Sequence, residues 1–295
     1  MNQGAKNRLR LWLRSERALG LGASIATKPG SAQVLVSEPD VEHVQEPAIP
    51  SRKAAPEAPF AEVAAPNEMA PRGGLMEPPS VEPFTAPLLS PDSKRSRLIA
   101  LDNNEVRGCT RCRLCETRTN TVFGEGDPDA SIFFIGEGPG ENEDLSGRPF
   151  VGKAGQFLDK MIAGMGLRRE QVFIANIVKC RPPNNRVPMP DEVATCTPYL
   201  ERQLEIIRPR VIVTLGLPSL KYMMNDAKLT MGKSRGTWRA WRGIKLMPTF
   251  HPAYVLRQYT DETRAAVWSD LKQVLAELGL PIPKRAGAGG GEKSS

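Results

Sequence analysis

Four short apolar runs that alternate with helical segments constrain the fold of this chain more than any other feature. The runs cover residues 131–135, 172–178, 211–215 and 245–250. Helical patterns fill the gaps and flank the runs, at residues 96–106, 153–165, 191–207 and 260–278. Continuous apolar strands separated by helices are typical of a parallel sheet covered on both faces. We therefore predict a three-layer α/β/α domain with a central, mainly parallel four-stranded sheet.

Proline content marks where this domain begins. Of the 27 prolines, 13 lie between Pro29 and Pro91, in a stretch without a sustained apolar period of either a strand or a helix. Such a composition is typical of disorder. We expect a basic N-terminal segment and a Pro/Ala-rich disordered arm over residues 1–93, the folded domain over 94–280, and a flexible tail over 281–295.

The N-terminal twenty residues intersperse Leu and Trp with Lys and Arg. They form a solvated basic end, a short amphipathic helix that docks a partner or touches nucleic acid, or an organelle transit peptide. A secretory signal and the ~20 apolar residues of a membrane span are both missing from the pattern. We expect a monomeric protein of the cytoplasm, in the bacterial cytosol or nucleoid, without a membrane partner. Its net charge of +7 and pI near 9.3 favour a polyanionic partner.

Five cysteines suggest a metal centre. Their odd number argues against a disulfide framework. Cys109, Cys112 and Cys115 lie in GCTRCRLC, Cys180 ends an apolar run, and Cys196 lies on the apolar face of a helix. Cysteines from the turn, the strand end and the helix can converge on an iron-sulfur cluster or on a structural zinc ion, and spacing does not decide between the two. Alternatively, Cys180 and Cys196 are small core residues.

Several chemically useful side chains follow the predicted strands, whose carboxyl ends meet at one edge of the sheet. The turn GEGPG, residues 136–140, does not match a phosphate-binding motif, and the carboxylate of Glu137 suits the orientation of a water molecule. His251 is either a structural residue or a donor to charge on a leaving group. Phe150 is either core or a wall for an aromatic ligand. The amide of Asn176 can both donate to and accept from the edge of a base.

Taken in order, these motifs resemble those of one enzyme family. The matching segments are GCTRC, FGEGDPDA, GEGPGENED, GRPFVGKAG, NIVKCRPPNNR and HPAYVLR, together with the Cys180 to Cys196 spacing. Over about residues 106–278 the chain resembles the family 4 uracil-DNA glycosylases, the iron-sulfur type. A family 5 enzyme is expected to lack the acid at Glu137.

The resemblance implies a function and a site. The enzyme would flip deoxyuridine out of DNA and hydrolyse its N-glycosidic bond, which initiates base excision repair. Uracil would stack on Phe150 and pair with the amide of Asn176, while Glu137 holds the attacking water and His251 stabilises charge on uracil O2. The implied catalytic residues are Glu137 and His251, and the implied substrate-binding residues are Gly138, Glu143, Phe150, Asn176 and Asn185.

The resemblance also implies a four-iron, four-sulfur cluster. Its ligands would be Cys109, Cys112, Cys180 and Cys196, with Cys115 as a spare, although ligation by Cys112 and Cys115 stays open. In the HPAYVLR segment, Tyr254, Val255 or Leu256 would enter the base stack, and Arg257 would meet a phosphate. Lys153 is expected at a helix start, either near the DNA backbone or as a solvated surface lysine. The rival interpretations are a non-catalytic cluster protein that binds nucleic acid and a zinc-stapled structural domain.

Overall fold

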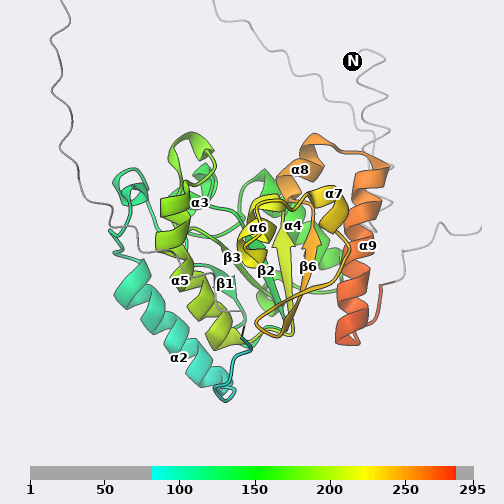
Figure 1. Ribbon diagram of the computed structural model, residues 1–295, viewed down its shortest axis with the longest axis horizontal. Coiled ribbons are helices and arrows are strands. Elements are labelled where there is room, and N and C mark those ends of the chain that lie inside the picture. Colours follow the sequence, from blue (N-terminus) through cyan, green and yellow to red (C-terminus); the bar gives the residue numbers. More distant parts are fainter. Residues whose placement is uncertain (1–81, 284–295) are drawn as a thin grey trace, which may run out of the picture. The chain divides into compact units, whose positions relative to one another are not determined.

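The structure is a computed structural model that describes residues 82–283. Its central feature is a six-stranded sheet in the order β1-β3-β2-β4-β6-β5. The four inner strands are parallel to one another, as predicted: β3 (Phe173–Asn176), β2 (Ile132–Gly136), β4 (Val211–Leu215) and β6 (Ile244–Thr249). In Figure 1 these strands run upward, so their carboxyl ends meet at the top of the view.

Two short edge strands complete the sheet and were not predicted. β1 (Glu125–Gly126) pairs antiparallel with β3, and β5 (Arg239–Trp241) pairs antiparallel with β6. A strand of two or three residues is too short to show an alternating apolar pattern, and β1 contains a glycine, which strands disfavour. The predicted four parallel strands are therefore the inner part of a mixed sheet.

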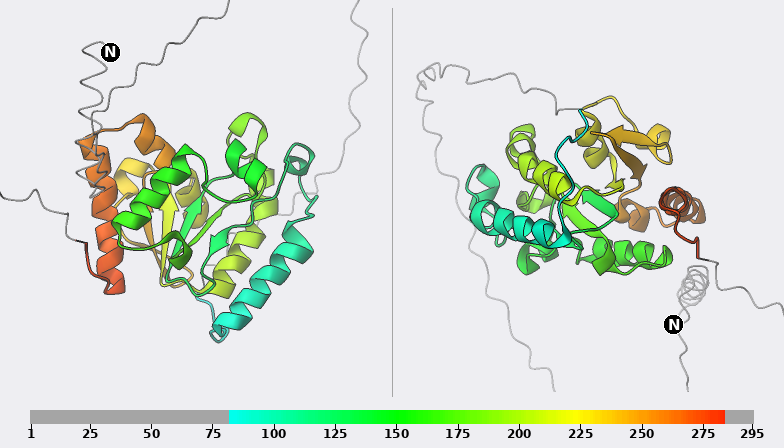
Figure 2. Two further views of the ribbon diagram at one scale, coloured as in Figure 1. Left: turned by 180° about the vertical axis from the view of Figure 1, so that it is seen from behind. Right: turned by 90° about the horizontal axis from the view of Figure 1, so that it is seen from below.

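Helices cover both faces of the sheet, because alternate residues of each inner strand point to opposite sides. In β2, Phe133 and Ile135 pack into one core and Ile132 and Phe134 into the other. The first core is closed by α2 (Pro91–Leu101), α5 (Pro190–Ile207) and α6 (Leu217–Met224). The second is closed by α4 (Lys153–Gly164), α8 (Pro252–Arg257) and α9 (Asp261–Leu278). Figure 2 shows α2 and α5 side by side on one face, and the three-layer prediction is confirmed.

The helix predicted over residues 96–106 begins earlier. Ser90 caps it by accepting a hydrogen bond from the main-chain N–H of Ser93, and Pro91 suits the first helical position. α2 then ends at Leu101 and continues as one π-helical turn, Asp102–Val106. The remaining short elements are α3 (Glu141–Ser146), α7 (Met231–Ser234) and three 3-10 turns at Arg113–Glu116, Arg169–Gln171 and Pro183–Asn185.

The chain is packed from Phe84 onward, inside the stretch assigned to the arm. The Phe84 ring lies 4.1 Å from the Arg208 guanidinium and 4.0 Å from that of Arg242, and its edge meets Trp241. Cation-π contacts of this kind stabilise by about 0.5–1 kcal/mol at exposed sites. The expectations for residues 1–81 and 284–295 lie outside the described residues. Over residues 82–283, no helix combines the length and the apolar character that a membrane crossing requires.

Candidate active site

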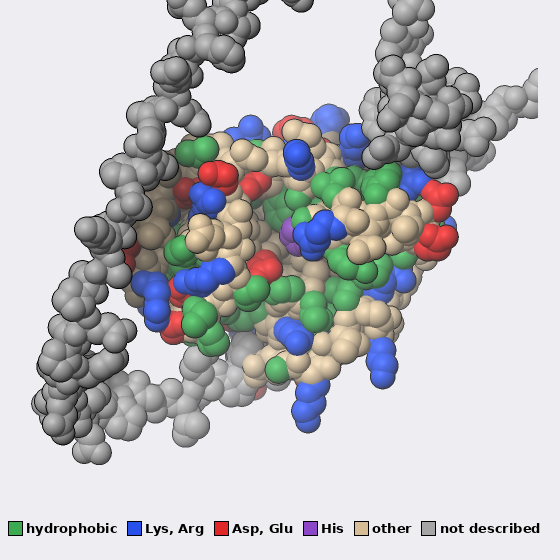
Figure 3. Space-filling view, turned by 90° about the horizontal axis from the view of Figure 1, so that it is seen from above, with side chains coloured by type: hydrophobic (Ala, Val, Ile, Leu, Met, Phe, Trp, Pro, Cys, Tyr) green, Lys and Arg blue, Asp and Glu red, His purple; other side chains and the backbone are tan. Residues whose placement is uncertain are grey.

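The carboxyl ends of the inner strands open into a cleft of about 940 Å³. Register places Gly136 of β2 directly beside Asn176 of β3, and His251 follows β6. Figure 3 looks onto this face and shows it hollowed, with Lys and Arg side chains around the hollow. All seven residues that the sequence indicated for catalysis and substrate binding line this one cleft: Glu137, Gly138, Glu143, Phe150, Asn176, Asn185 and His251.

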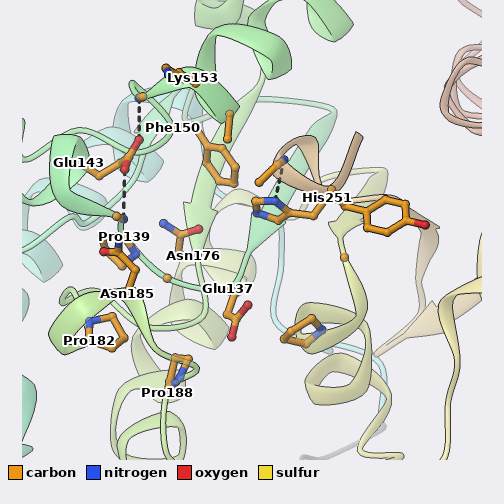
Figure 4. A pocket seen from close by; sticks show the side chains of 18 of the residues that line it. Glu137, Pro139, Glu143, Phe150, Lys153, Asn176, Pro182, Asn185, Pro188 and His251 are labelled. Carbon is orange, nitrogen blue, oxygen red and sulfur yellow. Dashed lines mark hydrogen bonds between the residues drawn. The ribbon is translucent and has the colours of Figure 1, made fainter. Parts of the chain in front are cut away.

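Phe150 and Asn176 form one wall of the cleft. In Figure 4 the Phe150 ring and the Asn176 amide border the same space, with His251 and Glu137 across from them. Asn176 is only 1% exposed, yet its Oδ1 accepts no hydrogen bond from any residue in the described part of the chain. A buried amide oxygen without a partner costs about 1–3 kcal/mol. The site therefore holds an acceptor that a ligand could satisfy.

The backbone around Phe150 is strained in a way that serves this wall. Phe150 has a φ of +52°, which non-glycine residues seldom adopt. Two glycines allow it to sit there. A Cβ on Gly155 would lie 1.8 Å from the Phe150 carbonyl oxygen, and a Cβ on Gly136 would lie 2.3 Å from Asn176 Oδ1 and 2.5 Å from Phe150 Cζ. Phe150 is buried and also lines the cleft, so it belongs to the core, and its role as a wall for an aromatic ligand stays a prediction.

Glu143 joins the two glycine-rich loops that frame the cleft. Its Oε1 accepts hydrogen bonds from the main-chain N–H groups of Val151 and Gly152, each at 2.8 Å, and its Oε2 accepts one from Gly140 at 3.1 Å. Figure 4 marks one hydrogen bond on each side of the Glu143 carboxylate. The carboxylate thus fixes the loop after β2 against the loop that carries Phe150. Its contacts are those of a positioning residue.

Replacing Glu143 with alanine is expected to loosen both loops. Loss of three charge-assisted hydrogen bonds should lower the free energy of unfolding by about 2–4 kcal/mol, since single bonds to charged groups contribute about 1.5–3 kcal/mol and are not additive. Denaturant titration measures this loss. Glu141→Ala is the matched control, because Glu141 lies in the same helix with its carboxylate 66% exposed and 3.8 Å from Arg181. Equal stability of the two variants would contradict the role of Glu143 in holding the two loops together.

His251 caps α8 and presents a neutral ring to the cleft. Its Nδ1 accepts a hydrogen bond from the main-chain N–H of Ala253 at 3.1 Å, so the proton of the neutral imidazole is on Nε2. Burial, and next the charge of Arg257, lower the pKa of His251 to about 4. The ring lies 5.7 Å from that of Phe150 between centroids. At neutral pH His251 is therefore an uncharged N–H donor.

Glu137 lines the cleft together with Glu141 and Glu143. Its Oε1 is buried and meets no hydrogen-bond partner within residues 82–283. Burial raises the pKa of Glu137 above its usual range. A carboxyl group with a raised pKa and a free lone pair in a cleft is suited to hold and activate a water molecule.

Charged side chains of both signs line the cleft, and one of its cations, Arg186, is ion-paired with Glu192. Lys153, at the start of α4 as predicted, lines the cleft together with Arg186 and Arg257. Asn185 is exposed at the rim, where its Oδ1 accepts a hydrogen bond from Arg181 Nε at 2.8 Å. Lysine and arginine side chains at a cleft rim suit contact with phosphates.

The structure corrects the prediction for the segment that would enter a base stack. Val255 is fully buried in the core under α8 and cannot reach a ligand. Tyr254 is 40% exposed and Leu256 is 38% exposed, so only these two of the three candidates are accessible. The reason is helical periodicity: α8 turns its middle residue inward and its neighbours outward. Tyr254 also stacks on Phe250, with centroids 4.9 Å apart.

The cysteines assemble at a second place, under the loop that follows β3. Four of them line one small cavity, and Cys115 does not: the lining cysteines are Cys109, Cys112, Cys180 and Cys196. Three of their sulfurs accept hydrogen bonds, from Arg118 Nη1 to Cys180 (3.1 Å), from the main-chain N–H of Lys179 to Cys196 (3.2 Å) and from Tyr199 Oη to Cys109 (3.3 Å). Within residues 82–283, no group of three or more His, Cys, Asp or Glu side chains is placed to hold a single metal ion.

Burial has a chemical consequence for these thiols. It raises the pKa of Cys180 and Cys112, and it raises the pKa of Cys196 to about 12. Because a metal binds the thiolate form, metal loading would have to displace these protons. The sequence indicated the four cysteines but not their donors Arg118 and Tyr199, because neither donor lies in a recognisable motif.

Comparison with known proteins gives the class of this site. The model of the uracil DNA glycosylase superfamily matches residues 123–272. The chain belongs to that superfamily.

The chain is similar to several proteins named Type-4 uracil-DNA glycosylase, and two of them show the extent of the similarity. The protein from Thermotoga maritima is 48% identical over 180 residues, which cover 61% of this chain and 94% of that protein. The protein from Sulfurisphaera tokodaii is 49% identical over 189 residues, covering 61% and 84%. A Type-5 uracil-DNA glycosylase from Pyrobaculum aerophilum is 29% identical over 173 residues, covering 52% and 75%. The resemblance to family 4 is confirmed.

Proposed function

We propose that this protein is a uracil-DNA glycosylase: it takes deoxyuridine out of the DNA stack, hydrolyses its N-glycosidic bond, releases uracil and leaves an abasic site for base excision repair. One observation carries the proposal. Phe150, Asn176, Glu137 and His251 come from four separate segments and line one cleft, in which Asn176 Oδ1 and Glu137 Oε1 are buried without partners in the described part. The relatives named above support the same activity.

The cleft suits the edge of uracil. The base would stack on Phe150, Asn176 Nδ2 would donate to O4, and Asn176 Oδ1 would accept from N3–H. Cytosine presents the reverse pattern at these two atoms, so it would leave buried polar groups unpaired. A site built to pair with one hydrogen-bonding pattern can reject the wrong ligand by about 10⁴-fold or more.

The catalytic step follows from the positions of His251 and Glu137. The bond between the sugar C1′ and uracil N1 breaks, and its electron pair leaves with uracil, where charge gathers on O2. His251 Nε2–H donates a hydrogen bond to that oxygen. Glu137 orients a water molecule toward C1′ and accepts its proton as the new C–O bond forms. Uracil leaves as an anion and takes a proton from solvent.

DNA would bind across the cleft rim. Lys153, Arg186 and Arg257 would face phosphates, and each neutralised phosphate releases counterions, which makes binding salt-dependent. Flipping a base costs a few kcal/mol, and an apolar side chain that fills the gap lowers this cost. Tyr254 and Leu256 are the accessible side chains for this task.

A four-iron, four-sulfur cluster is the metal group that we propose for Cys109, Cys112, Cys180 and Cys196. The donor set fits it: four cysteines share one cavity with N–H and O–H donors to their sulfurs. The same four thiolates would also suit a structural zinc ion, which stays the alternative. When bound, the cluster would cross-link the GCTRC turn, the loop after β3 and α5.

A cysteine series tests this ligand set. We expect Cys196→Ser to lose the absorption near 400 nm that is typical of such clusters and to unfold at a lower temperature. Cys115→Ser is the matched control and should keep both the colour and the melting temperature of the wild type. Loss of colour in Cys115→Ser with retention in Cys109→Ser would instead assign Cys112 and Cys115 as the ligands from the turn.

Three further expectations complete the proposal. The enzyme acts as a monomer, in the cytoplasm, and its N-terminal arm docks a partner that the sequence does not identify. Its basic first twenty residues and the net charge of +7 support a role near DNA or another polyanion.

Release of free uracil from an oligonucleotide that contains one uracil tests the proposed activity. The purified, cluster-containing protein should release uracil and leave an alkali-sensitive abasic site. A protein that binds the oligonucleotide without releasing uracil would be the non-catalytic accessory protein instead.

A further inference from the structure

Lys179 is a buried charge that the proposed mechanism does not use. It follows Asn176 by three residues and precedes Cys180, and it is 1% exposed. Its Nζ donates hydrogen bonds to the main-chain carbonyl of Asn176 at 2.9 Å and to Oε1 of Gln203 at 2.7 Å. Gln203 is itself held, because its Nε2 donates to the carbonyl of Phe123 at 2.9 Å. Lys179 therefore connects the end of β3, where Asn176 would read the base, with the cysteine cavity. The Lys179 side chain is part of the lining of that cavity.

No carboxylate in the described residues forms an ion pair with Lys179, which is unusual for a buried lysine. Lys94 provides the contrast within the same domain. It is also buried and also donates to a carbonyl, that of Ile207, but its ammonium pairs with Asp129 at 2.5 Å. Neutral oxygens satisfy the hydrogen bonds of Lys179 and leave its charge without a counterion.

The cysteines are among the groups that can balance this charge. Burial disfavours the charged form of Lys179, and Cys196, Asp102 and Cys180 favour it; of these three, Cys196 and Cys180 share the cavity that Lys179 lines. The main-chain N–H of Lys179 also donates to Cys196 Sγ at 3.2 Å. Four thiolates around an iron-sulfur cluster carry a net negative charge, and the cavity that they line has the Lys179 side chain in its wall.

We propose that Lys179 is a positioning residue that links the base-reading end of β3 to the metal centre: its ammonium fixes the carbonyl of Asn176 and supplies the buried positive charge that balances the cluster thiolates. This inference rests on the proposed function. It explains why a lysine, rather than an apolar residue, occupies a site inside the apolar run NIVKC.

Two separate effects follow from removing the ammonium. The carbonyl of Asn176 loses its donor, so the strand end loosens and the amide meets the flipped base less well, which slows the chemical step more than it weakens DNA binding. The thiolates lose a buried positive charge, so the metal centre becomes less stable, although Arg118 still donates to Cys180 Sγ. Mutation of outer partners of metal ligands typically costs about 10–100-fold in metal affinity.

The test compares the cluster-containing wild type with Lys179→Met, Gln203→Leu and Lys94→Met. The measurements are single-turnover uracil release, the DNA dissociation constant, and the rate at which absorption near 400 nm is lost in the presence of a chelator. For Lys179→Met we expect release at least about tenfold slower with an unchanged dissociation constant, and colour loss about tenfold faster. Lys94→Met should lower the melting temperature and change neither rate.

Gln203→Leu separates the two effects, because it removes an acceptor and keeps the charge. It should slow uracil release and leave the colour loss at the wild-type rate. The inference is overturned if Lys179→Met matches the wild type in either rate, or, should Lys179→Met not fold, if Gln203→Leu releases uracil at the wild-type rate. A wild type that releases no uracil refutes the proposed function instead, and the comparison of colour loss then still decides the charge-balancing role.

Discussion

His251→Ala is expected to release uracil about 100- to 1,000-fold more slowly than the wild type, with a nearly unchanged DNA dissociation constant, as is typical when one preorganised donor to a developing anion is removed. The reason lies in the ring's fixed orientation. The Ala253 N–H donates to Nδ1, which leaves Nε2–H as the donor to the cleft. The ground-state base gains little from this bond and the departing uracil anion gains much, so the loss appears in the rate.

His251→Gln is the informative companion, because its side-chain amide keeps an N–H donor. Single-turnover release should recover part of the rate lost in His251→Ala. Equal losses of rate and of DNA affinity in both variants would mean that His251 holds DNA rather than the transition state.

The pH dependence separates a neutral donor from a charged acid. Because the pKa of His251 is lowered to about 4 from its usual 6.5, the rate should not rise as the pH falls through 6.5. A cationic histidine would instead make the rate rise there. The lowered pKa also makes the free energy of unfolding depend on pH. As the pH falls, the unfolded chain binds a proton at His251 before the folded protein does. The contribution of His251 to stability is therefore complete above pH 6.5 and is lost as the pH falls toward 4. His251→Gln should remove that loss.

Glu137→Gln is expected to have the second large effect, a turnover lower by about 100-fold or more, since general-base groups typically contribute about 10²- to 10⁴-fold. Glutamine retains the shape and an oxygen for the water but cannot accept its proton. Single-turnover release is the measurement, and Glu141→Gln, on the exposed face of α3, is the control. A rate within twofold of the wild type would contradict the role of Glu137 as the base.

The same substitution should stabilise the fold. Burial raises the pKa of Glu137, so the unfolded chain ionises at lower pH than the folded one. At low pH the Glu137 side chain is protonated and its burial costs little. As the pH rises through the pKa of the folded state, the contribution of Glu137 to the free energy of unfolding is lost. At neutral pH, Glu137→Gln should therefore melt at a higher temperature than the wild type. A gain in stability with a loss of rate is typical of a residue kept for function.

Much of the site could be predicted because its chemistry lies in contiguous motifs at strand ends. Asn176 is the last residue of β3 and His251 follows β6, and parallel strands bring such positions to one edge. The inner strands are long enough to appear as apolar runs in the sequence, and these runs predicted the sheet. The edge strands β1 and β5 are too short to show such a run. Val255 was misplaced because a six-residue helix shows its inward face only once it is packed.

Long-range contacts made the rest unpredictable. The left-handed φ of Phe150 depends on Gly155 and Gly136, which contact it from different elements. The Lys179 ammonium finds Gln203 from α5 across 24 residues of chain. A sequence pattern reports which residues lie on one face of a strand or helix. It does not report which carbonyl or amide from elsewhere will meet them.

The central claim is that the amide of Asn176 and the ring of Phe150 select uracil in the cleft. The most direct test measures the release of free base by the cluster-containing wild type from two oligonucleotides that differ only in carrying uracil or cytosine at one position. Uracil should be released and cytosine should be retained, with rates that differ by about 10⁴-fold or more. Release of both bases at similar rates, or of neither, would contradict the account.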